Sequence, residues 1–288
     1  MIDPVFLAEA AVNGLLLGGV LALLALGLNL IFGVIDIVWI AYVDLVMICM
    51  YAVYFIVQVY GWPIWVGGLA SVALGALLGV SVHLLIITPI LTSAPVNQLL
   101  ATGGLLFFLQ SFATFLWTTD HRSVRLTLPR LELFDMPISV ARLIAFALSI
   151  LAMLGLYLFL SRTYIGTAIR AVSQDREAMA LMGANPQRVY LVTSAVGGAM
   201  AGVAAALLII QYAVHPFFGA AFGPITFMIC VLGGLGNMIG GFVASFVFAE
   251  IISVSGLYLD LEWGYVFAFG FFIAMMFAKP QGLLARRT

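Results

Sequence analysis

Long apolar runs, separated by short polar or glycine- and proline-rich breaks, dominate the chain. A helix that crosses a bilayer needs about 20 consecutive apolar residues. Short segments that alternate apolar and polar residues, as in a membrane barrel, do not occur. The pattern therefore predicts an all-α polytopic membrane protein in a single domain, residues 1–288, with about eight transmembrane helices: 10–34, a second ending near 60, a third ending near 87, 99–117, 143–160, 189–212, 238–255 and 264–278.

The last third of the chain is interrupted by Pro216 and Pro224 and by a cluster of glycines. Residues 224–232 would form only about 13.5 Å of helix, too short to span a membrane. We expect a re-entrant half-helix that opens at Gly223 and Pro224. Its free N–H groups and positive dipole end can hold an anionic group. The half-helix is one of two places that could form a permeation path through the membrane. The candidate residues here are His215, Phe217, Gly223 and Thr226. The alternative for His215 is an interfacial histidine in an outer turn.

A second candidate for the path is a membrane-depth segment after the first span, interrupted by Asp36 and Asp44. An ionisable side chain at this depth is costly, so it usually faces a cavity or a partner. Trp39, Tyr42 and Asp44 are the candidate residues. The alternatives are aromatic belt positions for Trp39 and Tyr42, and a structural hydrogen bond between helices for Asp44. For Glu250, in a later span, we favour the structural hydrogen bond.

Residues 163–188 form a polar stretch between two apolar runs, and they predict a short helix on the water side. Ser173 suits the N-cap, and Asp175 and Glu177 suit the first turn, where the helix dipole favours acids. Gly183 suits the left-handed residue that ends a helix. The next helix is expected to start with an Asn185 cap and with Pro186 in its first turn.

This short helix has an apolar face formed by Ala178, Leu181 and Met182, which lie three or four residues apart. Such a face needs a cover. One reading is a docking site for another protein, to which Arg170 and Arg176 would also contribute. The other is a loop helix that lies against its own bundle or against lipid headgroups.

Small residues recur at the four-residue spacing that lets membrane helices approach closely. Gly14 and Gly18 form one such pair, and Gly198 and Gly202 form another in similar surroundings. The two pairs hint at an internal repeat of the kind found in transporters.

Composition supports the membrane class, because 65% of the residues are hydrophobic and only 8% are charged, against roughly a quarter charged in soluble domains. Four arginines flank a polar loop at 118–140, and the other seven basic residues lie in or beside 163–188 and at the C-terminus. The positive-inside rule then places 163–188 in the cytoplasm, and 118–140 and the N-terminus outside. The N-terminus lacks the basic region of a signal peptide. A net charge of −1 without a basic tract argues against nucleic acid.

No catalytic or metal-binding pattern stands out. Cys49, Cys230 and the three histidines lack ligand spacing. A P-loop is excluded, since its lysine follows glycine and the only lysine here, Lys279, follows Ala278. We expect neither an enzyme nor a directly bound cofactor, so any ATP hydrolysis must occur in another subunit.

Four stretches together resemble the permease subunits of branched-chain amino acid ABC transporters, of the LivH-like type. They are NGLLLGGVLALLALGLNLIFGV from residue 13, IGTAIRAVSQDREAMALMGANPQRV from residue 165, VLGGLGNMIGG from residue 231 and KPQGLL from residue 279. The resemblance covers almost the whole chain. It implies the fold of a type II-like ABC importer permease in the bacterial inner membrane.

The resemblance implies that residues 170–183 form a cytoplasmic coupling loop that docks into an ATPase subunit, with Glu177, Ala178 and Gly183 at matching positions. It also implies a second, LivM-like permease, two ATPase subunits that hold ATP and Mg²⁺, and a periplasmic substrate-binding protein. The ATPases would close on ATP, push the coupling helices and switch the pore from inward-facing to outward-facing.

The chain departs from the family along the path. Where members carry Asn-Phe-Ala-His-Gly, it has residues 39–43, WIAYV, and it has His215-Pro216 where members often carry Asn-Pro. The expected substrate is a branched-chain or other hydrophobic amino acid, followed by an aromatic or organic carboxylate, or urea. A rival reading is an ion-gradient-driven secondary carrier, which would need no docking helix.

Overall fold

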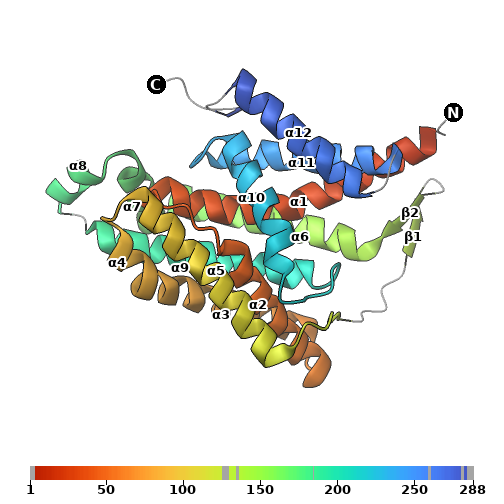
Figure 1. Ribbon diagram of the computed structural model, residues 1–288, viewed down its shortest axis with the longest axis horizontal. Coiled ribbons are helices and arrows are strands. Elements are labelled where there is room, and N and C mark those ends of the chain that lie inside the picture. Colours follow the sequence, from red (N-terminus) through yellow and green to blue (C-terminus); the bar gives the residue numbers. More distant parts are fainter. Residues whose placement is uncertain are drawn as a thin grey trace.

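The computed structural model describes residues 4–124, 130–133, 136–183, 185–258, 261–279 and 282–283, and these are nearly all helical (Figure 1). Within this part, seven helical stretches are long and apolar enough to cross a membrane. The chain is thus a multi-pass membrane protein. The stretches are α1 (Pro4–Ile35), α2 (Tyr42–Tyr54) with its π-helical end η1 (Phe55–Val59), α3 (Ile64–Val82) with η2 (His83–Ile87) and α4 (Thr88–Ile90), α5 (Pro95–Trp117), α6 (Val140–Arg162), α9 (Pro186–Leu208) and α11 (Met238–Tyr258).

Two further apolar helices are shorter, α10 (Phe218–Gly233) and α12 (Leu261–Ala278). All eight predicted runs are helical, which confirms the fold class. The predicted start of the half-helix at Pro224 is wrong, since α10 begins six residues earlier and Pro224 lies inside it. Proline removes its own N–H donor and its ring crowds the carbonyl four residues earlier, but membrane helices tolerate this where neighbouring groups satisfy the freed backbone. With 16 residues, α10 is about 24 Å long, shorter than the bilayer core.

Two antiparallel helix pairs with glycine-lined contacts form the framework. α3 packs on α9, where a Cβ atom at Gly75 would overlap the carbonyl oxygen of Gly198. In the same seam, Ser71 Oγ donates a hydrogen bond to the carbonyl of Gly202 over 2.6 Å. α1 packs on α11 in the same manner, with Gly14 against Glu250 and, at the other end of the pair, Gly33 against Gly236.

The two pairs suggest an inverted repeat in which α1, α2 and α3 correspond to α9, α10 and α11. α1 and α9 lie side by side and antiparallel, because the residues at the N-terminal end of α1 share a cavity with those that follow α9 (Glu9, Asn13, Ile210 and Gln211). Each is followed by a non-helical segment, residues 36–41 and 209–217, and then by a shorter helix. The arrangement agrees with the repeat hinted at by the glycine pairs.

α2 and α10 begin next to each other inside the bundle and run towards opposite ends. Asp44, in the first turn of α2, lies against Gly219 of α10. The last part of α2 packs against the C-terminal end of α5, where the Tyr51 and Trp117 rings are 4.1 Å apart. The last residue of α10, Gly233, instead contacts Gly240 near the start of α11.

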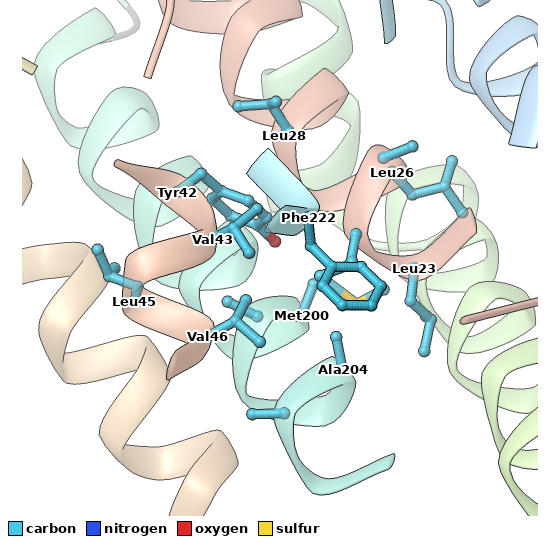
Figure 2. Close-up of a cluster of buried hydrophobic side chains, with 14 of the residues drawn as sticks. Leu23, Leu26, Leu28, Tyr42, Val43, Leu45, Val46, Met200, Ala204 and Phe222 are labelled. Carbon is cyan, nitrogen blue, oxygen red and sulfur yellow. The ribbon is translucent and has the colours of Figure 1, made fainter. Parts of the chain in front are cut away.

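Apolar side chains from four helices fill the centre of the bundle (Figure 2). In that view, Phe222 of α10 lies between side chains of the other three. They are Leu23 and Leu26 of α1, Val43 and Val46 of α2, and Met200 and Ala204 of α9.

The ends of the bundle differ. At one end is an antiparallel hairpin, β1 (Arg130–Leu133) and β2 (Met136–Ser139), inside the predicted outer loop; at the other end is α8 (Arg176–Leu181) (Figure 1). We call these the hairpin end and the α8 end. These strands were not predicted, because four-residue strands carry little periodic signal in the sequence.

Candidate functional site

The polar stretch forms two helices at the α8 end, α7 (Tyr164–Gln174) and α8. The cap of α8 is Asp175, whose Oδ1 accepts hydrogen bonds from the amides of Glu177 (3.0 Å) and Ala178 (2.9 Å). The prediction of Ser173 as the cap is wrong: α7 continues to Gln174, and Ser173 Oγ donates to the carbonyl of Arg170 within that helix. Glu177 does lie in the first turn.

The end of α8 has the predicted geometry. Gly183 has φ +86°, the left-handed region that glycine adopts without strain. Asn185 then caps α9 by accepting from the amide of Gln187 over 3.0 Å, and Pro186 is the first residue of that helix.

The apolar end of α8 has no cover within the described chain. Leu181 is 90% exposed and Met182 is 82% exposed, whereas α7 is anchored by the buried Ile169 and Val172. The reading in which the whole apolar face lies against its own bundle is therefore wrong for Leu181 and Met182. Arg170, Arg176 and Glu177 are exposed around them.

α8 contacts the segment that leads into the core. Arg176 Nη2 lies 3.7 Å from Asp36 Oδ2, and both side chains are more than half exposed. Asp36 was expected at membrane depth, but it terminates α1 at the surface with φ 62°. Beside this pair is a cavity of about 430 Å³, lined by the end of α1, the end of α7 and Gly236.

The interior candidates are deeply buried. Trp39, Tyr42 and Asp44 are each 1% exposed. Tyr42 Oη donates to the carbonyl of Gly197 over 3.0 Å, and Gly197 is halfway along α9. The interpretation of Trp39 and Tyr42 as aromatic belt residues is wrong. Belt side chains face the lipid headgroups at the membrane interface, whereas these two are buried within the bundle.

Asp44 lies where α2, α5 and α10 meet. Its Oδ1 accepts a hydrogen bond of 3.0 Å from Gln110 Nε2 of α5, and its Oδ2 is buried without a partner. On its other side, the carboxylate fills the position that a Cβ of Gly219 would take. Gln110 and Gly219 were not among the predicted site residues; the signal for Gln110 is that it is a polar residue inside the apolar run of α5.

The four predicted path residues in and just before α10 lie at different depths along the bundle. The His215 ring is 4.5 Å from that of His121 at the hairpin end, where Val214 and Arg122 exchange backbone hydrogen bonds. Burial, and then His121, lower the pKa of His215. Phe217 precedes α10 and is half exposed. Further along α10, Thr226 is fully buried and donates to the carbonyl of Phe222 over 2.8 Å, while Gly223 borders open space.

Asn29, a fully buried polar residue of α1, was not among the predicted site residues. Its Oδ1 accepts from the amide of Gly236 over 3.2 Å and ties α1 to the turn before α11. Glu250 lies against Gly14 in the same pair of helices. Among the described residues, no group of three metal-ligating side chains occurs.

Comparison with known proteins gives one family. Residues 10–276 match the model described as "Branched-chain amino acid transport system / permease component". The chain is 29% identical to the high-affinity branched-chain amino acid transport system permease protein LivH of Escherichia coli K12, over 95% of this chain and 94% of the relative. It is 27% identical to the corresponding protein BraD of Pseudomonas aeruginosa, over 96% and 95%. No solved structure matches significantly.

Proposed function

The chain belongs to the family of branched-chain amino acid transport permeases, and from this premise we propose that it is the membrane subunit of an ATP-driven ABC importer. Its substrate is a branched-chain or other hydrophobic amino acid, or a related small carboxylate. The chain forms the translocation path and does not hydrolyse ATP. ATP and Mg²⁺ bind to two cytoplasmic ATPase subunits.

The observation that carries the proposal is the uncovered apolar end of α8. Leu181 and Met182 are almost fully exposed, yet α8 is held in place by the Asp175 cap before it and by Gly183 and the Asn185 cap after it. A short helix with a defined position and exposed apolar residues suits insertion into a groove of a partner protein. In this importer the groove belongs to an ATPase subunit.

The contacts give a route from α8 to the path. Arg176, the first residue of α8, pairs with Asp36, and Asp36 begins the segment that carries Trp39 and leads to Asp44 at the start of α2. Displacement of α8 therefore acts on this segment directly. The cavity of about 430 Å³ beside the pair leaves room for that movement.

The rest of the assembly follows from the same proposal. A second, LivM-like permease completes the pore, and a periplasmic binding protein delivers the substrate at the hairpin end. The complex resides in the bacterial inner membrane, with α8 on the cytoplasmic side.

Purification in mild detergent from its native cells tests the proposal. An affinity-tagged chain should bring down ATPase subunits, and proteoliposomes of the complex, supplied with the binding protein, should transport only with ATP. Leu181→Cys and Met182→Cys should cross-link to an ATPase subunit. Tyr60→Cys is the matched control and should not, because Tyr60 is also highly exposed but follows η1, at the opposite end of α2 from the contact between α8 and Asp36. A chain that purifies alone and transports on an ion gradient without ATP would instead be a secondary carrier.

A further inference from the structure

Asp44 is unusual among the acidic residues whose side chains the structure describes, because it alone is fully buried. Removing a carboxylate from water is costly unless it is paired and hydrogen-bonded. Within the described chain, Asp44 has no basic partner within ion-pair distance. Its burial therefore requires an explanation.

The two carboxylate oxygens have different surroundings. Oδ1 accepts from Gln110 Nε2, whereas Oδ2 is buried and accepts nothing. An ionised carboxylate has room for about four donors. The site therefore retains unused acceptor capacity at Oδ2, inside the bundle and about level with the middle of α9, given the Tyr42 contact to Gly197.

Two helix N-termini meet at this carboxylate. Asp44 is in the first turn of α2, and it contacts Gly219, the second residue of α10. Each N-terminus carries a partial positive charge, which stabilises an anion there. The predicted site for an anionic group of the solute was a half-helix start at Gly223 and Pro224. At the actual start of α10 the neighbouring anion is instead the chain's own Asp44 carboxylate.

This arrangement determines which charge a solute can present. A second carboxylate beside Asp44 would be repelled, and a neutral amide would leave the charge uncompensated. A primary ammonium group offers three donors and a positive charge to Oδ2.

We propose that Asp44 binds the ammonium group of the transported solute within the translocation path. The inference rests on the proposed function and narrows it: the solutes are amino acids or amines, and simple organic carboxylates and urea are not accepted.

The substitution Asp44→Asn tests the charge with little change of shape, since the oxygen that accepts from Gln110 can be kept. Native cells that lack the chromosomal copy are complemented with each variant, and uptake of radiolabelled L-leucine is measured. We expect Asp44→Asn to raise KM or lower uptake by at least about tenfold, the effect of losing a charge-assisted hydrogen bond. The amount of assembled complex and its melting temperature should stay near wild type.

Glu250→Gln is the matched control, because it removes another carboxylate from a membrane helix, away from this point. It should transport like wild type. Uptake by Asp44→Asn equal to wild type would overturn the inference and leave the transport function standing. A wild-type strain that takes up no L-leucine would count against the proposed substrate class itself.

Ligand-induced thermal stabilisation of the purified wild-type complex gives a second readout, which needs no variant. 3-Methylbutylamine, which has the ammonium group alone, should raise the melting temperature. 4-Methylpentanoate, which has the carboxylate alone, should not. The opposite ranking would overturn the inference, even if Asp44→Asn failed to fold.

Discussion

Arg176 and Asp36 join the exposed helix α8 to the end of α1 across 140 positions of sequence, with 3.7 Å between guanidinium nitrogen and carboxylate oxygen. Exposed ion pairs of this kind contribute about 0.2–1 kcal/mol to stability. The pair therefore matters little for holding the fold. Its position suggests a role in transmitting movement from α8 to the segment that precedes Asp44.

Reversing the charge at either position should uncouple transport without unfolding the protein. We expect Arg176→Glu or Asp36→Arg to lower ATP-driven uptake several-fold, with a change in melting temperature of no more than a few degrees. The double variant, with both charges exchanged, should recover part of the uptake because the attraction is restored. Equal uptake in all three variants would show that the pair transmits nothing.

The exposed apolar end of α8 should carry much of the affinity for the ATPase subunits. Replacing Leu181 and Met182 together with serine should reduce co-purified ATPase at least about tenfold, since a few buried apolar anchors dominate such interfaces. Tyr60→Ser removes another large, highly exposed side chain, which is 72% exposed, and should leave the yield unchanged. Full recovery of ATPase with the double serine variant would place the docking surface elsewhere.

The α3–α9 seam should not tolerate even a methyl group. A Cβ at Gly198 would overlap the carbonyl oxygen of Gly75, and overpacking of this kind costs about 1–3 kcal/mol. Gly198→Ala should therefore lower the melting temperature. Gly103→Ala, in α5 with no atom within 4 Å of the added carbon, should be neutral or slightly stabilising, because alanine is the better helix former. Thermal unfolding in detergent measures both.

The contact of His215 with His121 should make the hairpin end sensitive to acid. Burial and His121 lower the pKa of His215 in the folded chain, below its ordinary value of about 6.5. The folded state therefore resists protonation, and as pH falls from about 6.5 towards the lowered pKa, only the unfolded state gains the proton. Stability should be full at neutral pH and fall over this interval.

The pH sensitivity can be measured as the difference in melting temperature between pH 7.5 and pH 5. His215→Gln should shrink the difference that wild type shows. The other charged groups near this contact, Asp120 and Arg122, are unchanged in the variant. An identical pH dependence in both proteins would mean that other groups set the acid sensitivity.

Much of the fold could be predicted, because membrane helices leave long apolar runs and their ends carry local signals. The stop at Gly183 and the cap at Asn185 are examples. The start of α10 could not be predicted in this way. From the sequence alone, Pro224 predicts the start of a helix. It lies inside α10 instead, where the surrounding helices make a proline tolerable.

The interior site was harder to predict, since its partners are far apart in sequence. Trp39, Tyr42 and Asp44 stood out as polar or aromatic residues in an apolar segment, but nothing local indicates that Gln110 and Gly219 meet Asp44. Asp36 and Asp44 have the same side chain and lie eight residues apart. One is at the surface and the other is buried, because α1 ends at the surface just before Asp36 and the chain then returns into the bundle, where α2 begins at Tyr42.

α2 and α10 begin next to each other inside the bundle, and this arrangement limits leakage of solute through the membrane. The two helices run from this common level towards opposite ends of the bundle, so in the proposed importer we expect that tilting one of them opens the packing on one side while the other helix still fills the opposite side. A channel open to both sides of the membrane at once would require both helices to move together. A cell that spends ATP to accumulate a solute against its gradient depends on that exclusivity.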